Sequence, residues 1–67
     1  MNYSVHRNRD GSRFDAAEFV TLDEALAHAA NICGVTLRTM KKRYSKSPAG
    51  EVSGREMGRD GVWVEEI

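Results

Sequence analysis

The residues of this chain best suited to chemistry are the basic side chains between positions 36 and 46. An arginine on the outward side of a helix can pair bidentately with guanine in the DNA major groove, whereas lysines hold phosphates in position without reading sequence. The basic residues recur at the spacing of a helical face, which would carry Arg38, Lys41, Lys42 and Lys46. We therefore expect this segment to bind a polyanion, with double-stranded DNA as its partner.

Charge is segregated along the sequence, although the formal net charge of the 67 residues is zero. Residues 14–35 contain four carboxylates and no lysine or arginine, whereas residues 36–59 contain seven basic and two acidic side chains. Such a chain can present a cationic face to a polyanion whatever its overall balance. We interpret the four carboxylates as a solvated face that compensates a helix dipole; they are Asp15, Glu18, Asp23 and Glu24.

Two consecutive helices are expected to position the basic residues, and the first spans about residues 22–33. It begins after Thr21, because Thr21 and Glu24 have the spacing of a capping box. It ends before Gly34, a residue that tolerates the left-handed conformation common after helices. The predicted apolar face of this helix consists of Leu22, Leu26, Ala29, Ala30 and Cys33.

The second helix is expected over about residues 36–46, and it carries the basic side chains. Thr36 can cap its first turn, and Met40 and Tyr44 recur four residues apart as its inward side. Pro48 prevents the helix from continuing, because proline has no amide hydrogen and disfavours helix in the residue before it.

Strands are expected on both sides of the helix pair. Residues 1–20 form a β arm or hairpin around a turn near Gly11, and residues 51–67 form a terminal hairpin around residues 58–61. Following a basic helix, the second hairpin would lie where a wing does, with Arg55 and Arg59 able to reach phosphates. The fold class is therefore α+β, in one small domain.

Residues 21–46 resemble the helix-turn-helix of bacterial and phage regulators. With the hairpin that follows, the stretch to Val64 is similar to compact winged members such as excisionases and MerR-type DNA-binding heads. The positions that carry the resemblance are Ala30 at the helix crossing, Gly34 in the turn, Val35 after it, the cap Thr36, the inward pair Thr39 and Met40, and the basic run Lys41, Lys42 and Arg43. The chain departs from the motif at Arg43, where an apolar residue is usual, and at Leu37, where a polar base reader is usual.

The resemblance implies a small sequence-specific DNA-binding protein that inserts its second helix into the major groove and uses no cofactor. A transcriptional regulator or an excisionase-like architectural factor of phage or mobile-element type would fit. The implied DNA-binding residues are Thr36, Leu37, Arg38, Lys41, Lys42, Ser45 and Lys46, with Arg55 and Arg59 from the wing. A homodimer on paired half-sites is expected, because one short helix reads few base pairs.

Other kinds of site are not expected. His6, His28 and Cys33 are too scattered for a zinc spacing, and a thiol on an apolar helix face is inert, so neither a metal site nor an enzyme is predicted. The single cysteine and the absence of an apolar run of about 20 residues favour a cytoplasmic protein without a membrane segment.

A protein-binding inhibitor is the alternative. Strands from both ends of the chain would then form one antiparallel sheet packed on the helix at 22–33, and residues 35–44 would be a strand. In size and element order this chain is similar to some small phage anti-CRISPR proteins, and such a protein would bind a host or defence-system protein instead of DNA.

Overall fold

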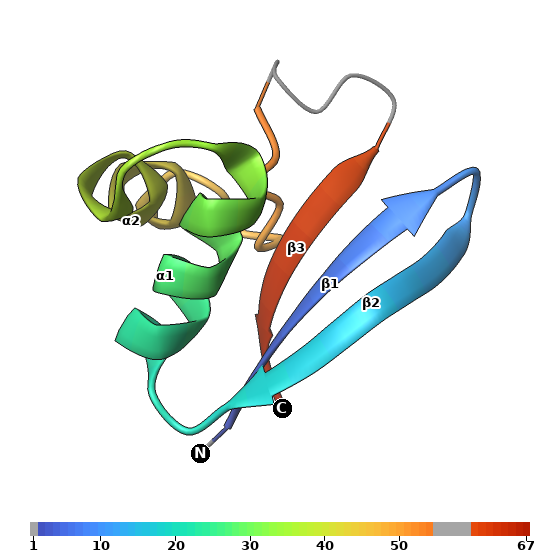
Figure 1. The fold of residues 1–67 in the computed structure, drawn as a ribbon, viewed down its shortest axis with the longest axis horizontal. Helices are drawn as coiled ribbons and strands as arrows, with labels where there is room; N and C mark the ends of the chain where they lie inside the picture. The colour runs from blue at the N-terminus through green and yellow to red at the C-terminus, as the bar shows by residue number, and fades with distance from the viewer. Residues whose placement is uncertain (1, 55–59) are drawn as a thin grey trace.

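The computed structural model describes residues 2–54 and 60–67. Its elements follow the order of two strands, two helices and one strand (Figure 1): β1 Tyr3–Arg9, β2 Ser12–Phe19, α1 Leu22–Cys33, α2 Leu37–Ser45 and β3 Gly61–Glu66. The α+β class is thus confirmed. Among these residues no helix combines the length and apolar character needed to cross a membrane.

The three strands form one antiparallel sheet in the order β2-β1-β3, and both helices lie on the same side of it (Figure 1). Val5 of the central strand is paired with Ala17 of β2 and with Val64 of β3. Because side chains alternate across a strand, Val62 and Val64 of β3 point to the same side as Val5. The strands from both ends of the chain therefore share one apolar face, which the helices cover.

The core lies between this face and α1. It consists of Val5, Ala25, Leu26, Ala29, Ala30, Cys33, Met40, Val52, Val62 and Val64. The alanines of α1 allow that helix to approach the sheet closely, and Met40 brings α2 against the same cluster. The described part of the chain thus contributes ten core residues, few of them large, which leaves little energetic margin at this size.

Local capping determines where α1 begins and ends. The Thr21 hydroxyl oxygen accepts a hydrogen bond from the Glu24 amide at 3.2 Å, and the same hydroxyl donates to the Glu24 carboxylate at 2.9 Å. At the other end Gly34 adopts φ 70°, and the amide of Val35 donates to the carbonyl of Ala30 at 3.0 Å. The predicted helix at 22–33 is confirmed at both ends.

Capping also starts α2, since Thr36 accepts from the Thr39 amide at 3.2 Å. The predicted limits of 36–46 are wider by the two capping residues, Thr36 and Lys46, than the observed helix. Residues 37–45 are helical, so the strand that the inhibitor alternative required at 35–44 is wrong. The two threonines that favoured that strand instead bond to each other at the helix start, over 3.1 Å.

The terminal strand pairs mainly with β1, in the sheet of both chain ends that the inhibitor alternative expected. β3 pairs along its length with β1, and the expected return pass of a hairpin is limited to residues 50–52, through bonds of 2.8 Å that join Val52 to Val62 and Gly50 to Val64. Of the predicted terminal hairpin at 51–67 the described residues show this short antiparallel pairing, and β3 is in addition a strand of the sheet, where Val62 and Val64 are buried beside the central strand. Arg55 and Arg59 lie outside the described residues.

Candidate nucleic-acid interface

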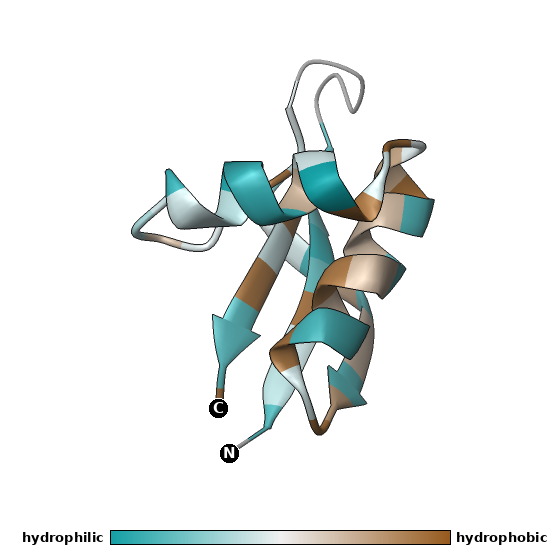
Figure 2. Ribbon diagram, turned by 90° about the vertical axis from the view of Figure 1, so that its left-hand side faces the viewer, coloured by the Kyte–Doolittle hydropathy of each residue, from teal (hydrophilic) through white to brown (hydrophobic). Residues whose placement is uncertain are grey.

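The outward side of α2 is polar and carries most of the predicted DNA-binding residues. Figure 2 faces this helix, and most of its ribbon has the colour of hydrophilic residues. Each of the following is exposed: Thr36, Arg38, Lys41, Lys42, Ser45 and Lys46. Met40 is fully buried beneath them, so the helix presents one side to the core and the other to solvent.

Leu37 does not belong to this outward surface. It is half-buried and packs against the hydrophobic core, so its prediction as a base-reading residue needs correction. The physical reason is the hydrophobic effect: at the first turn of α2 an apolar side chain can reach the core and leaves the water-facing side to Arg38.

Arg43 is half-buried and turned toward the segment that follows α2. Its Nη1 donates to the carbonyl oxygens of Val52 and Ser53, each at 3.3 Å. Gly54 lies so close to the guanidinium that a Cβ there would come within 3 Å of it. Arg43 therefore binds backbone carbonyls of the segment after α2, and its charge serves the fold.

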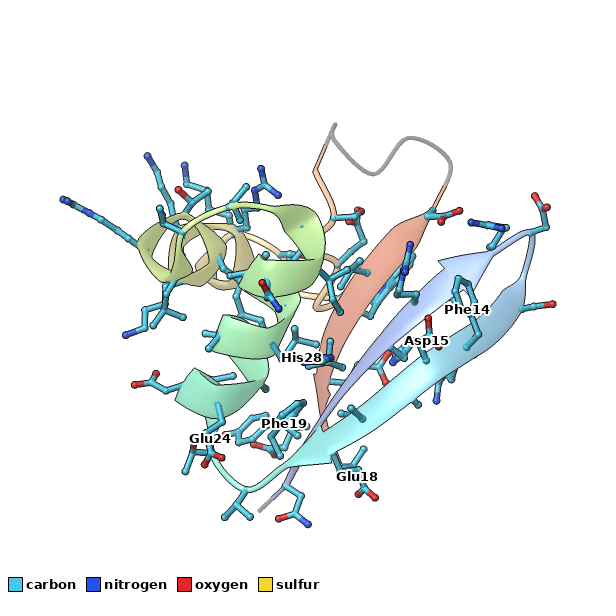
Figure 3. The ribbon with its side chains drawn as sticks, in the orientation of Figure 1. Phe14, Asp15, Glu18, Phe19, Glu24 and His28 are labelled. Atoms are coloured by element: carbon cyan, nitrogen blue, oxygen red, sulfur yellow. The ribbon has the colours of Figure 1, made fainter. Side chains whose placement is uncertain are left out.

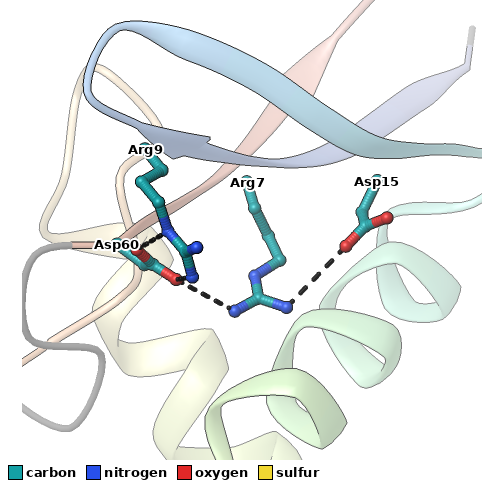
Figure 4. Close-up of polar contacts among 4 residues, drawn as sticks. All are labelled: Arg7, Arg9, Asp15 and Asp60. Atoms are coloured by element: carbon teal, nitrogen blue, oxygen red, sulfur yellow. Dashed lines mark hydrogen bonds and ion pairs between the residues drawn. The ribbon is translucent and has the colours of Figure 1, made fainter.

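The arginines of the sheet are also engaged. Asp60 lies just before β3 and accepts from both β1 arginines: from Arg9 Nε and Nη2 at 2.8 Å each, and from Arg7 Nη2 at 3.2 Å (Figure 4). The Arg7 guanidinium also lies 3.8 Å from the carboxylate of Asp15. Hydrogen bonds from Arg9 hold the pKa of Asp60 below its usual value, and the same contact raises the pKa of Arg9.

Three cations of α2 and its C-cap contrast with these. The side chains of Arg38, Lys42 and Lys46 form no ion pair or hydrogen bond with any residue of 2–54 or 60–67. Lys41 has one ion pair, with Asp23 at 3.6 Å, and both side chains are at least half exposed. The side of the molecule formed by α2 therefore holds positive charge that the described carboxylates do not neutralise.

The residues considered for metal or thiol chemistry lie apart. His6 is buried on the sheet face away from the helices, and its ring stacks on Trp63 with centroids 6.1 Å apart. His28 lies on α1, where its ring contacts Phe19 at 5.0 Å, and Cys33 is buried in the core. In the parts of the chain that the structure describes, no three histidine, cysteine or carboxylate side chains are grouped to hold a metal ion.

Three of the four acidic residues singled out in the sequence, Asp15, Glu18 and Glu24, lie along β2 and the start of α1, whereas Asp23 reaches the cationic side through its ion pair with Lys41. Figure 3 labels this region, in which Glu18 points away from the helices and His28 points toward the sheet. Between β2 and α1 runs a groove of about 370 Å³ lined by Arg7, Asp15, Ala16, Ala17, His28 and Ile32. Sequence reasoning did not find this groove, which depends on how the helix lies over the sheet.

Comparison with known proteins adds no relative: no family model, curated protein or solved structure matches this chain.

Proposed function

We propose that the protein binds double-stranded DNA, with α2 as the helix that enters the major groove. The observation that carries the proposal is the contrast between two sets of cations. Arg7, Arg9 and Arg13 face carboxylates of the sheet, whereas Arg38 and Lys42 extend from α2 with none among the described residues. Positive side chains left free on one helical face are suited to phosphate binding.

The residues of α2 divide by role. Arg38, in the first turn, is the candidate base reader, and a bidentate pair with guanine would contribute about 1–3 kcal/mol of discrimination. Lys42 and Lys46 lie further along the helix and are candidates for phosphate contacts, as is the Thr36 hydroxyl at its start. A transcriptional regulator or an architectural factor would both use such a helix-turn-helix, with Arg55 and Arg59 as further candidates for phosphate binding.

The distribution of negative charge supports the same orientation. Asp15, Glu18 and Glu24 lie along β2 and α1, and that side would be repelled by a phosphate backbone. A polyanion is therefore steered to α2, although the whole chain is formally neutral.

A titration of labelled duplex DNA of random sequence at two salt concentrations tests the proposal. Binding should weaken as salt rises, and Lys42→Ala should weaken it on every sequence and lower the salt slope by about one. Arg38→Ala should instead reduce the preference among sequences recovered by selection. Arg9→Gln is the matched control, since it removes one positive charge from β1 and should leave DNA affinity unchanged.

A protein-binding inhibitor remains the second candidate, and the sheet supports it. Strands from both ends of the chain pack together on α1, which is the arrangement expected for that class. Absence of binding to duplex DNA at low salt would overturn the first proposal in favour of the second.

A further inference from the structure

The outer edge of β2 is open to a further strand. β2 is the longest strand, with eight residues, and among the described residues its only strand neighbour is β1. Most of its side chains are exposed. An edge strand presents a row of backbone donors and acceptors that can pair with another chain.

The sequence of β2 is complementary to itself in antiparallel pairing. If a two-fold axis passes between Asp15 and Ala16, Arg13 of one copy stands opposite Glu18 of the other, and the same pair occurs twice. Opposite charges directly across an antiparallel pair are stabilising, and like charges are destabilising.

Arg13 and Glu18 face the same side because β2 contains a bulge. Arg13 is paired with Asn8 of β1 and Glu18 with Ser4, positions four apart on one face of that strand. Residues five apart on a regular strand would face opposite sides, but the register shifts at the middle of β2, where Asp15 has φ 54°. Both copies carry the same bulge, so the two residues of each pair that the axis creates face the same side of the sheet.

On the opposite face of the paired strands, the same register places a large side chain beside a small one. Phe14 of one copy would stand opposite Ala17 of the other, on the side facing the helices. Ala17 lines the groove between β2 and α1, together with Ala16, His28 and Ile32. An aromatic ring entering this groove would bury apolar surface at the centre of the contact. Asp15, nearest the axis, has its charge offset by Arg7 at 3.8 Å.

We propose that the protein forms a homodimer through antiparallel pairing of β2 with β2 of a second copy. The two sheets then become one sheet of six strands. Two charge pairs between Arg13 and Glu18 set the register, and Phe14 anchors each copy in the groove of the other.

The arrangement has a consequence for α2, which rests on the proposed function. A two-fold axis between antiparallel neighbours runs perpendicular to the sheet, so the helices of both copies lie on the same side of it. Two α2 helices related in this way are suited to two half-sites of opposite orientation on one duplex.

The test is the oligomeric state of the full chain in the absence of DNA, measured by sedimentation over a range of protein concentration. The wild-type chain should dimerise. Arg13→Glu and Glu18→Arg should each raise the dissociation constant about tenfold, because each sets like charges opposite one another. The double variant carrying both changes restores opposite charges and should dimerise like the wild type.

Further measurements keep the outcome decisive. Circular dichroism confirms that each variant is folded, and Phe14→Ala should weaken the dimer without charge change. A chain that stays monomeric, or a dimer that neither single reversal weakens, would overturn the proposed contact. A monomer that binds duplex DNA would overturn only the dimer, whereas a dimer that fails to bind DNA would overturn only the proposed function.

Discussion

The ammonium nitrogen of Lys41 lies 3.6 Å from a carboxylate oxygen of Asp23, so the cationic side of α2 and the first turn of α1 are joined by an ion pair. Both side chains are well exposed, which limits the contribution of the pair to folding to about 0–1 kcal/mol. Its larger effect is on the potential around α2, because Asp23 is the acidic side chain paired to the candidate interface.

Asp23→Asn should therefore strengthen DNA binding about two- to threefold at low salt, because Lys41 becomes available to phosphate. The gain should shrink as salt is added. Fluorescence anisotropy on one duplex at several salt concentrations measures it. Glu66→Gln removes the same charge from the end of β3 and is the matched control; an equal gain there would attribute the effect to net charge alone.

Acid should destabilise the protein through His6. Burial is the main cause that lowers the pKa of His6, with Arg13 adding to it and Glu65 opposing it. The unfolded chain therefore binds more protons than the folded one below the ordinary pKa of 6.5. The contribution of neutral His6 to the free energy of unfolding should be fully present above about pH 6.5. It should be lost progressively as pH decreases toward the folded-state pKa.

Urea denaturation at a series of pH values, followed by the fluorescence of Trp63, measures this dependence, since the indole stacks on the His6 ring. His6→Phe keeps an aromatic ring at the position and should remove the decline between neutral pH and the range in which carboxylates titrate. A variant that declines as steeply as the wild type would assign the effect to other groups.

Asp60 should govern stability at lower pH. Its pKa is held down mainly by the hydrogen bonds from Arg9, so its contribution is present above the ordinary carboxylate pKa of 3.8 and is lost as pH falls through the folded-state pKa. Asp60→Asn should lower the urea midpoint at pH 7 and flatten the dependence below pH 4. An unchanged midpoint at pH 7 would show that the contacts from Arg7 and Arg9 do not stabilise the fold.

Two glycines in the left-handed region should respond differently to alanine. Gly34 has φ 70° with open space where a Cβ would stand, so Gly34→Ala costs only backbone strain, about 1 kcal/mol. At Gly50, φ is 84° and a Cβ would collide with the carbonyl of Val64, so Gly50→Ala should cost about 3 kcal/mol. Chemical denaturation compares the two, and equal losses would contradict the close approach of Gly50 to β3.

The helices could be predicted from the sequence because their limits depend on neighbouring residues. Thr21, Thr36 and Gly34 act through hydrogen bonds or backbone angles within a few positions, and each was recognisable from type and spacing. The β1–β2 hairpin was one of the two forms predicted for residues 1–20, and its turn near Gly11 was recognisable for the same reason. Information of this kind is local, and it was sufficient to predict the limits of both helices and the position of the first turn.

The sequence allowed two arrangements of β3, a terminal hairpin and a sheet shared with the N-terminal strand, and local information could not decide between them. An alternation such as that of Val62 and Val64 fits a terminal hairpin as well as a sheet strand, and the choice depends on Val5, far away in sequence. The candidate site was limited similarly. The cations of α2 were identifiable by type, but the inward turn of Arg43 and Leu37 depends on contacts that only the folded chain makes.

The central position of β1 constrains how the protein is made. Of the elements that the structure describes, β1 is synthesised first, yet one of its two neighbours, β3, is synthesised after the other four. During translation β1 can pair with β2 and receive α1, while its second edge stays unprotected until β3 emerges. Contacts between segments so distant in the chain form slowly. Until they form, the unpaired strand edge is exposed, and exposed edges favour aggregation of nascent chains. The yield of folded protein should therefore depend on how quickly translation proceeds from α2 to β3.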